Sequence, residues 1–452
     1  MKETGVAIAG FVLLVGLLGA AVPADDEQFW AQWRGPLMTG VAPQGNPPVE
    51  WAENKNVVWK IQIAGRGMGT PVVWDDRVFV TTAIAVEQTS QAAEVPPRQE
   101  PGNRDGRGGR GGRRASGPEP VHEFHVLAVS REDGSVLWDQ TALVERPHEG
   151  KRDNNTFASP SAITEGQNVI AFFGSRGLYC YDMDGNLRWQ KDLGDMTIRN
   201  AFGEGATPAL YGDTLVVPWD HRGQSFIVAL DKNTGEELWR TDRDEIDAWA
   251  TPLVVEHDGV PQVITAGTNR VRSYNLTNGE LLWEGDGLTM NPIPSPVSAD
   301  GVVYLTSGYR GNALRAIRLA DAKGDVTGTS AVLWEHNRDT PYVSSPLLYQ
   351  NNLYFLKSNS AILTTLDART GEPLYDPIRL EGLSEVYASP VGASGRVYLL
   401  GRDGNALVID NGPEFQILAQ NSLDDGFDAS PAIVGEEMYL RGYRNLYKIA
   451  EN

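Results

Sequence analysis

Two short patterns recur along this 452-residue chain at nearly constant spacing. One is a polar turn that ends in Gly and is followed four residues later by an aromatic residue, as in "DKNTGEELWRTD" at residues 231–242. The other is a hydroxyl residue before Pro, found at Thr70-Pro71, Ser159-Pro160, Thr207-Pro208, Thr251-Pro252, Ser295-Pro296, Ser345-Pro346, Ser389-Pro390 and Ser430-Pro431. From Pro160 onward these prolines are 48, 44, 44, 50, 44 and 41 residues apart. Such a period is typical of β-propellers, so eight copies predict eight blades.

Each unit contains short β-rich runs separated by turns, such as "TLVVPW" and "FIVALD" in the third unit. We therefore predict an all-β fold, an eight-bladed β-propeller of four-stranded antiparallel blades. The eighth unit reaches the end of the chain after three runs, whereas "NVVWKIQI" at residues 56–63 resembles a fourth run without its unit. We expect this N-terminal strand to complete the last blade and close the ring, since closure removes the open sheet edge.

The aromatic residue of each unit falls on the outermost strand, where it can lie flat between neighbouring blades. A side chain of this kind buries about 150–250 Å², so one per blade contributes strongly to adhesion between blades. Gly235 supplies the positive φ that the preceding turn needs. The seventh unit has degenerated to "IDNGPEFQIL". The predicted docking residues are Trp59, Trp138, Trp189, Trp239, Trp283, Trp334 and Tyr375.

The third unit resembles a known family in detail. Its Ala229-x-Asp231-x-x-Thr234-Gly235-x-x-x-Trp239 matches the tryptophan-docking motif of the PQQ-type (pyrroloquinoline-quinone-type) eight-bladed propellers, and the similarity extends over about residues 50–452. The segment "FWAQWRGP" at residues 29–36 resembles the lead-in of secreted members of that family. The family includes quinoprotein dehydrogenases and BamB-like scaffold proteins. Because the motif is a packing device, it specifies the fold and says little about function.

Outside the repeats, the composition divides the chain further. We predict a secretory signal peptide over residues 1–24, a lead-in over residues 25–55, the propeller over residues 56–452, and a disordered Arg/Gly/Pro-rich insertion over residues 86–121 within the first blade. The apolar run of the signal leaves an uncleaved anchor as the alternative. With cleavage we expect a periplasmic or secreted protein with no membrane span. The insertion is either a tolerated linker or a basic arm that contacts an anionic envelope component.

The charge balance constrains the partners. The chain carries 59 acidic and 39 basic side chains, a net charge of −20. This argues against nucleic-acid binding, which needs a basic face, and favours a monomer kept apart from its copies by repulsion. A protein partner or an anionic envelope component is compatible with this net charge.

Three functions are compatible with the sequence. The leading hypothesis is a non-enzymatic binding or scaffold protein of the cell envelope or secreted fraction. The first alternative is a PQQ-dependent oxidoreductase, or a degenerate relative, which would use PQQ and calcium. The resemblance implies a disulfide between adjacent cysteines for that activity, and this chain has only Cys180, in the apolar run "LYCYD". The second alternative is a small-molecule or glycan-binding module. We assign no catalytic, cofactor-binding or metal-ligating residue.

Binding in propellers usually occurs on one face. The segments before each Ser/Thr-Pro and those after each second strand share a face, because these strands are antiparallel. Aromatic and charged residues in these segments are candidates for a binding funnel, although ordinary loop chemistry explains them equally well. They are Asn155, Arg199, Glu204, Asp220, His221, Trp249, Arg270, Asn291, Arg310, Tyr342, Tyr387, Arg402 and Asp428.

Overall fold

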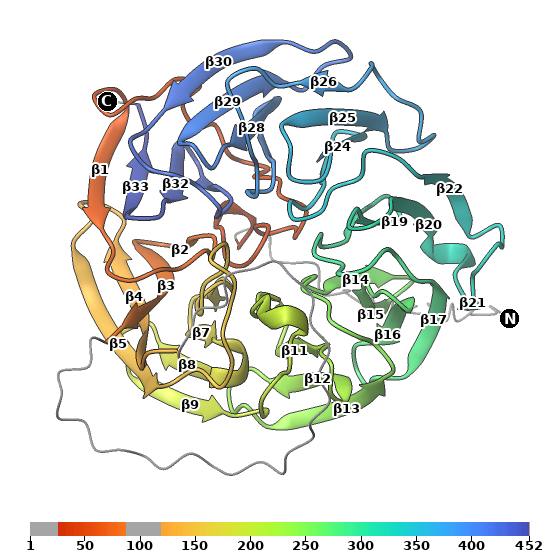
Figure 1. Cartoon of the computed structure of the whole chain (residues 1–452), viewed down its shortest axis with the longest axis horizontal. Coiled ribbons are helices and arrows are strands. Elements are labelled where there is room, and N and C mark those ends of the chain that lie inside the picture. The colour runs from red at the N-terminus through yellow and green to blue at the C-terminus, as the bar shows by residue number, and fades with distance from the viewer. Residues whose placement is uncertain (1–25, 87–118, 452) are drawn as a thin grey trace, which may run out of the picture.

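The computed structural model describes residues 26–86 and 119–451. The predicted signal peptide and most of the predicted insertion lie outside the described residues. Eight sheets surround a central axis as the blades of a propeller (Figure 1). Seven sheets have four antiparallel strands, and the fourth blade adds a short fifth strand, β21 (Gly324–Asp325), parallel to its outer edge. The predicted all-β, eight-bladed fold is therefore confirmed.

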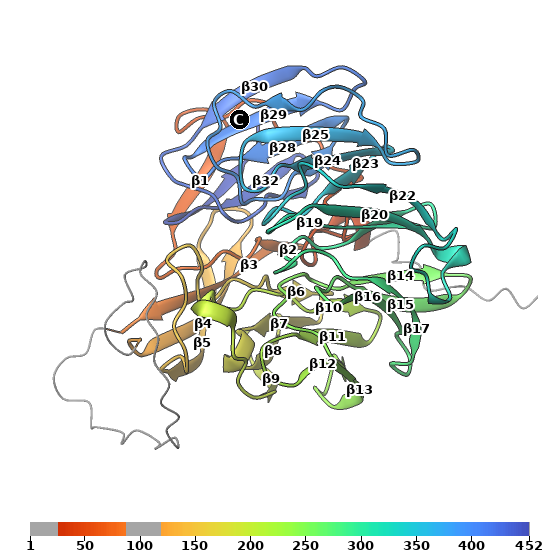
Figure 2. The same cartoon turned by 45° about the vertical axis from the view of Figure 1, so that its right-hand side comes forward.

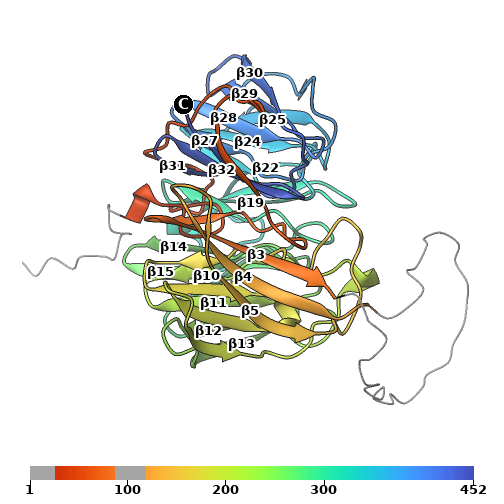
Figure 3. The ribbon, with the colours of Figure 1, turned by 90° about the vertical axis from the view of Figure 1, so that its left-hand side faces the viewer.

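The first four blades follow the chain from the innermost strand outward. Blade 1 contains β2 (Val72–Trp74), β3 (Arg77–Ala85), β4 (His122–Ser130) and β5 (Val136–Glu145). Blade 2 contains β6 (Ile163–Thr164), β7 (Asn168–Phe172), β8 (Leu178–Asp182) and β9 (Leu187–Lys191). Blade 3 contains β10 (Ala209–Tyr211), β11 (Thr214–Trp219), β12 (Ser225–Asp231) and β13 (Glu237–Arg243). Blade 4 contains β14 (Leu253–His257), β15 (Val260–Thr265), β16 (Arg270–Asn275) and β17 (Leu281–Asp286). In the side view the strands of blade 3 lie one beyond another in this order (Figure 3).

The remaining blades repeat the plan. Blade 5 contains β18 (Val297–Ala299), β19 (Val302–Ser307), β20 (Ala313–Arg318) and β22 (Val332–His336). Blade 6 contains β23 (Leu347–Tyr349), β24 (Asn352–Leu356), β25 (Ile362–Asp367) and β26 (Ile378–Arg379). Blade 7 contains β27 (Val391–Ala393), β28 (Arg396–Leu400), β29 (Asn405–Asp410) and β30 (Ile417–Ser422). Blade 8 contains β31 (Ala432–Val434), β32 (Glu437–Arg441), β33 (Asn445–Ile449) and β1 (Val57–Gln62). The described 3-10 helices are η1 (Asp26–Gln28), η2 (Gly174–Arg176), η3 (Arg199–Ala201) and η4 (Leu319–Asp321).

The N-terminal strand closes the ring, as the sequence predicted. Strand β1 is the outermost strand of blade 8 and pairs antiparallel with β33, with Trp59 opposite Lys448. The two segments are far apart in sequence but lie side by side in Figures 1 and 2. Each end of the chain thus contributes strands to one sheet, and no blade is left incomplete.

Contacts between blades depend on the aromatic residues of the outer strands. The indole of Trp239 donates a hydrogen bond from Nε1 to the carbonyl of Leu276 in the next blade, at 2.7 Å. A Cβ on Gly279 would lie 2.5 Å from the same indole, so the turn of the next blade needs Gly there. Equivalent indole bonds to the following blade are made by Trp59, Trp138, Trp189 and Trp334.

Two of the predicted docking residues are held differently. Trp283 bonds to Gln262 Oε1 within its own blade at 3.1 Å, where blade 5 replaces the short turn with the segment that carries η4 and β21. Tyr375 bonds to Thr365, and its ring meets Phe415 of blade 7 edge-on at 6.2 Å. At the joint between blades 6 and 7, two smaller aromatic rings thus take the place of an indole contact.

The hydroxyls at the start of the innermost strands link the blades around the axis. The backbone N–H of each such residue donates to the hydroxyl of the next blade, as in Thr207 to Thr251 Oγ1 at 3.1 Å and Thr251 to Ser295 Oγ at 3.2 Å. We call Thr70, Ser161, Thr207, Thr251, Ser295, Ser345, Ser389 and Ser430 the hydroxyl ring; bonds join the seven consecutive pairs from Thr70 to Ser430. In blade 2 the ring member is Ser161, two residues after the Ser159 that the Ser/Thr-Pro pattern indicates.

The segment over residues 29–46, here the strap, runs across the innermost strands near the axis (Figure 1). It exchanges backbone bonds with Val73 of blade 1 and donates to Gly392 and Gly435 of blades 7 and 8. The fully buried guanidinium of Arg34 donates to the carbonyls of Pro346 and Pro390, each at 2.7 Å. A Cβ on Gly40 would lie 2.2 Å from this guanidinium. These contacts of the strap therefore tie the consecutive blades 6, 7, 8 and 1 together.

Among the residues that the structure describes, no helix is long and apolar enough to cross a membrane.

Candidate functional site

A cavity of about 380 Å³ lies on the propeller axis, within the usual range of small-ligand sites of about 300–1,000 Å³. We call it the funnel. Its lower wall is the hydroxyl ring, from which Ser161, Thr207, Thr251, Ser295, Ser345 and Ser389 line it. Its upper wall is aromatic, formed by Phe202, Trp249, Tyr309, Tyr342 and Tyr387, all half-buried. Polar groups therefore lie deep and aromatic rings nearer the mouth.

Trp33 of the strap forms the floor of the funnel. Its indole lines the cavity, and Nε1 donates to Ser295 Oγ of the hydroxyl ring at 3.1 Å. Neighbouring strap residues are fixed on both sides, because Gln32 accepts a bond from Leu210 of blade 3 and Arg34 reaches blades 6 and 7. The central channel is therefore blocked on the strap side, and the funnel is blind.

The mouth is narrowed by contacts across the ring. Asn154, in the loop that leads into blade 2, donates from Nδ2 to the hydroxyl of Tyr387 between blades 6 and 7, at 3.0 Å. The rings of Tyr309 and Tyr342 stack with centroids 4.7 Å apart. The guanidinium of Arg402 lies 4.1 Å from the centroid of the Tyr387 ring. These contacts hold the aromatic wall in a defined shape before any ligand arrives.

One carboxylate lines the described part of the funnel, and it is neutralised. Asp428 Oδ1 accepts from Arg402 Nε at 2.7 Å and from the Tyr443 hydroxyl at 3.2 Å. Arg402 also donates to Glu385 at 2.9 Å. Burial alone would lower the pKa of Arg402, but its hydrogen bonds and charge interaction with Asp428 outweigh burial and raise that pKa. Burial raises the pKa of the Asp428 carboxyl, while the hydrogen bonds from Arg402 and Tyr443 act in the opposite direction.

The structure brings five of the thirteen predicted residues together in the funnel wall, namely Asn155, Trp249, Tyr342, Tyr387 and Asp428. Arg402 lies directly behind two of them. Asn155 holds the loop ahead of blade 2 by donating to the carbonyls of Phe202 and Glu204. Trp249 donates to the carbonyl of Gly203 at 2.7 Å.

Asp220 and His221 lie elsewhere, in the loop that follows β11 of blade 3. Both are buried. Asp220 accepts two bonds from Arg243, at 2.8 and 3.0 Å. His221 Nδ1 accepts from the backbone of Thr197 at 3.0 Å, and burial lowers the pKa of the imidazole. A neutral histidine that accepts backbone hydrogen bonds holds a loop in place and is not available as an acid.

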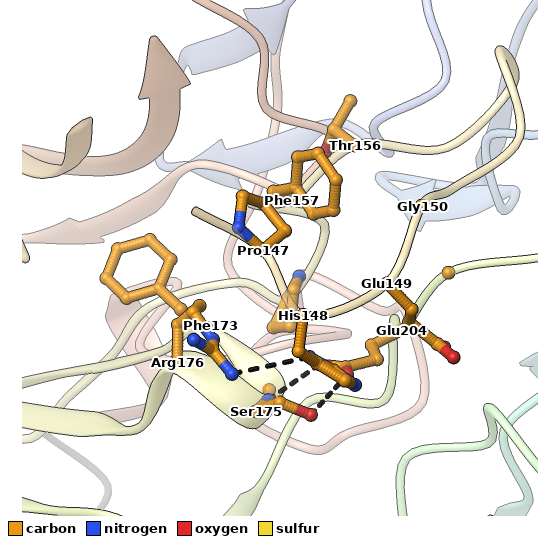
Figure 4. A pocket seen from close by; sticks show the side chains of 13 residues that line it. Pro147, His148, Glu149, Gly150, Thr156, Phe157, Phe173, Ser175, Arg176 and Glu204 are labelled. Carbon is orange, nitrogen blue, oxygen red and sulfur yellow. Dashed lines mark hydrogen bonds between the residues drawn. The ribbon is translucent and has the colours of Figure 1, made fainter. Parts of the chain in front are cut away.

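Glu204 lines a second, much smaller cavity, of about 20 Å³, between blades 2 and 3 (Figure 4). Its carboxylate accepts from the backbone and the hydroxyl of Ser175, at 2.7 and 2.5 Å. Burial raises the pKa of the carboxyls of Glu204 and of its neighbour Glu149. This space holds about one water, so it is a polar packing defect and too small for a substrate.

The other four predicted residues do not line the funnel. Arg199 is half-buried in η3, and its backbone N–H donates to Asp247 at 3.0 Å. Arg270 reaches Asp325 of β21 at 3.3 Å. Asn291 is buried with a left-handed φ of 52°. Arg310 is exposed, and its guanidinium lies 5.4 Å from the centroid of the Tyr309 ring.

Several wall residues were not predicted as site residues. The hydroxyl ring was visible in the sequence as the Ser/Thr-Pro repeat, but that pattern indicated only the number and spacing of the blades. Trp33 stood in the quoted "FWAQWRGP" segment, with no signal that the segment crosses the axis. Met68, Phe202, Ile293, Tyr309 and Val343 carry no pattern that separates them from other loop residues.

The donor set of the funnel does not fit PQQ with calcium. Calcium takes six to eight oxygen ligands, usually including several carboxylates. Asp428 is the one carboxylate among the described lining residues, and Arg402 and Tyr443 already occupy its oxygens. PQQ is an anionic quinone, and the described lining contains no Lys or Arg. Cys180 is buried in β8, where burial raises the pKa of its thiol to about 12.

Comparison with known proteins identifies relatives that match most of the chain. A family model described as "Outer membrane protein assembly factor BamB" matches residues 41–204 and 178–326, which is more than half of the chain. The curated BamB of Yersinia pestis is 24% identical over 337 residues, covering 70% of this chain and 77% of that protein. The BamB of Francisella salina is 31% identical over 107 residues, covering 24% of this chain and 18% of that protein.

Solved structures show the same fold at low sequence identity. The crystal structure of BamB from Moraxella catarrhalis has a TM-score of 0.51 and 15% identity, over 72% of this chain and 93% of that chain. A europium-containing methanol dehydrogenase has a TM-score of 0.62 and 10% identity, over 94% and 98% of the two chains. These likenesses concern the fold alone. The match of the family model carries the assignment: the chain belongs to the PQQ-like repeat propeller family of the outer membrane protein assembly factor BamB.

Proposed function

We propose that the protein is a non-enzymatic scaffold of the cell envelope, periplasmic or secreted, and that it holds a protein partner on the funnel face. The observation that carries the proposal is the state of the charged groups there. The one carboxylate among the described lining residues, Asp428, is paired with Arg402, which also bonds to Glu385. The described lining of the funnel therefore offers no unpaired acid or base for proton transfer, which general acid–base chemistry requires.

The mouth of the funnel has the composition of a protein-binding surface. Half-buried aromatic rings from several blades surround it, and Tyr and Trp are the residues most enriched among interface anchors. Cross-ring contacts such as Asn154 to Tyr387 already fix these rings, so a partner would meet a preformed surface and lose little side-chain entropy on binding. The names of the BamB relatives, which refer to outer membrane protein assembly, agree with a protein partner in the envelope.

Site-specific photocrosslinking in the producing cells tests this proposal. A photoreactive phenylalanine at Tyr309 of the mouth is expected to give one discrete protein adduct. The matched control is Leu238 on β13, the outermost strand of blade 3, which is 52% exposed, and it should give none. The purified partner should then bind the wild type and lose at least tenfold in affinity to Tyr309→Ala. Equal adducts at both positions, or undiminished binding to the variant, would refute a partner site at the mouth.

The oxidoreductase alternative has its own test. Adding PQQ with calcium to the purified protein is expected to leave tryptophan fluorescence unchanged apart from linear inner-filter loss, because the described funnel provides neither a free carboxylate nor a cation. Saturable quenching that requires calcium would contradict the proposal and favour the alternative.

A further inference from the structure

The hydroxyl ring has hydrogen-bond donors that the protein does not use. In the links described above, each of Thr207, Thr251, Ser295, Ser345 and Ser389 accepts a backbone N–H with its oxygen. Within residues 26–86 and 119–451, the structure provides no acceptor for the hydroxyl protons of these five side chains. All five are at least nine-tenths buried. A buried donor without an acceptor costs about 1–3 kcal/mol, so water or a ligand must accept these protons.

These donors surround an aromatic floor. The indole N–H of Trp33 is already bonded to Ser295, and the half-buried side chain lines the cavity. Above it, Trp249 and the stacked pair Tyr309 and Tyr342 form the walls. A ligand on this floor therefore meets aromatic carbon below and at its sides, and O–H donors around its lower edge.

The charged groups around the cavity restrict the class of ligand further. The only described carboxylate in the lining is paired with Arg402, and the described lining has no Lys, Arg, His or Glu. An anionic ligand would enter without a counter-ion, on a protein of net charge −20, and a cation would find no unpaired carboxylate. The cavity therefore favours a neutral molecule.

We propose that the floor of the funnel binds one ring of a neutral saccharide. A pyranose ring has an apolar C–H face, which packs against an indole, and ring and hydroxyl oxygens around its edge, which accept the O–H donors of Thr251, Ser345 and Ser389. Amides at the mouth, such as Asn154, lie where a second sugar unit or a linkage would emerge. This inference goes beyond the proposed scaffold function and does not depend on it, since the floor lies below the mouth that a protein partner would contact.

Saturation-transfer NMR and calorimetry on the purified full-length protein test the inference. The probes are the methyl glycosides of glucose, galactose, mannose and N-acetylglucosamine, with methyl glucuronide as the anionic counterpart. We expect at least one neutral glycoside to receive saturation from aromatic protons and to bind at least tenfold more tightly than the uronide. Trp33→Ala should weaken that binding at least tenfold, whereas Leu37→Ala, an exposed change on the same strap, should not alter it.

A second variant, outside the strap, keeps the test valid if Trp33→Ala fails to fold. Thr251→Val keeps the shape of the side chain and removes one hydroxyl of the ring, so it should weaken binding of the same glycoside at least threefold while far-UV circular dichroism stays that of the wild type. The inference is overturned if none of the neutral glycosides binds, if the uronide binds as tightly, or if both variants retain wild-type affinity. Loss of sugar binding with an intact crosslink at Tyr309 would leave the scaffold proposal standing.

Discussion

Glu204 shows how a loop residue becomes a pH-sensitive part of the packing. Burial raises the pKa of its carboxyl above the ordinary value of 4.5. Between 4.5 and the raised pKa, the folded state binds a proton that the unfolded chain has lost, so the free energy of unfolding falls as pH rises through this window. The stabilisation is complete below pH 4.5 and is lost above the folded pKa.

Glu204→Gln removes this titration and keeps an acceptor for the Ser175 N–H. We expect the melting temperature of the variant to change less than that of the wild type between pH 5 and pH 8, because the variant has no carboxyl to ionise at that position. Glu381→Gln, at an exposed position, is the control and should follow the wild type. Thermal melts across this pH range measure the difference, and parallel curves for Glu204→Gln and wild type would show that the carboxyl does not titrate there.

Single side chains were the least predictable feature from sequence. Asp220 and His221 follow a second strand as expected, yet both are buried away from the funnel, against Arg243 and the backbone of Thr197. Asp428, which was predicted from the segment before Ser430-Pro431, does reach the funnel. The difference depends on loop paths set by tertiary contacts, which spacing along the chain does not encode.

At the scale of single elements, the turn between the third and fourth strands carries the adhesion between blades. Gly279 and Gly259 both lie in turns of blade 4 and have nearly the same φ, 74° and 75°. A Cβ on Gly279 would lie 2.5 Å from the Trp239 indole, whereas a Cβ on Gly259 would meet nothing within 4 Å. The two positions therefore separate backbone strain from loss of the docking contact.

Gly259→Ala is expected to lower the free energy of unfolding by about 1–2 kcal/mol, because a side chain at positive φ is strained. Gly279→Ala should cost a further ~1–3 kcal/mol, because the added methyl overpacks the joint between blades 3 and 4. Denaturant unfolding followed by tryptophan fluorescence measures both values. If both variants lose the same free energy of unfolding, the packing of the Trp239 indole does not require a glycine opposite it.

Elements were predictable because their signals are local and repeated. Strand patterns, the Gly turn and the outer-strand Trp recur in most units, so each copy supports the others, and the closing strand β1 was found as the missing part of the pattern. The exceptions have identifiable causes. Ser159-Pro160 matched the pattern in letters, but Ser161 occupies the ring position in blade 2. The fifth strand β21 arises from an excursion in blade 5 that no repeat predicts.

For the whole molecule, ring closure joins the two ends of the chain through Trp59. Its indole is 8% exposed, donates to the carbonyl of Arg131 in blade 1 and contacts Gly134 across the same joint. Trp59→Ala should reduce the free energy of unfolding by about 3–5 kcal/mol, as for other large-to-small core changes. Val58→Ala, on the same strand with 41% exposure, is the control and should change it little. Equal unfolding midpoints for Trp59→Ala and wild type would contradict closure by this strand.

The central claim of this account is that the N-terminal segment is an integral part of the propeller, which closes the ring with β1 and blocks the axis with the strap. Both the blind funnel and its Trp33 floor depend on it. Backbone N–H groups of Trp30, Ala42, Asn46 and Ile63 donate to blades 1, 7 and 8 and to Arg444 next to β33. Such amides exchange with solvent only when the structure opens.

Hydrogen–deuterium exchange with peptide-level mass spectrometry tests this claim most directly. We expect peptides over residues 29–63 to be protected for as long as peptides from the innermost strands of blades 7 and 8. Exchange of residues 29–63 at the rate of an unstructured chain, while the other blades stay protected, would contradict the account.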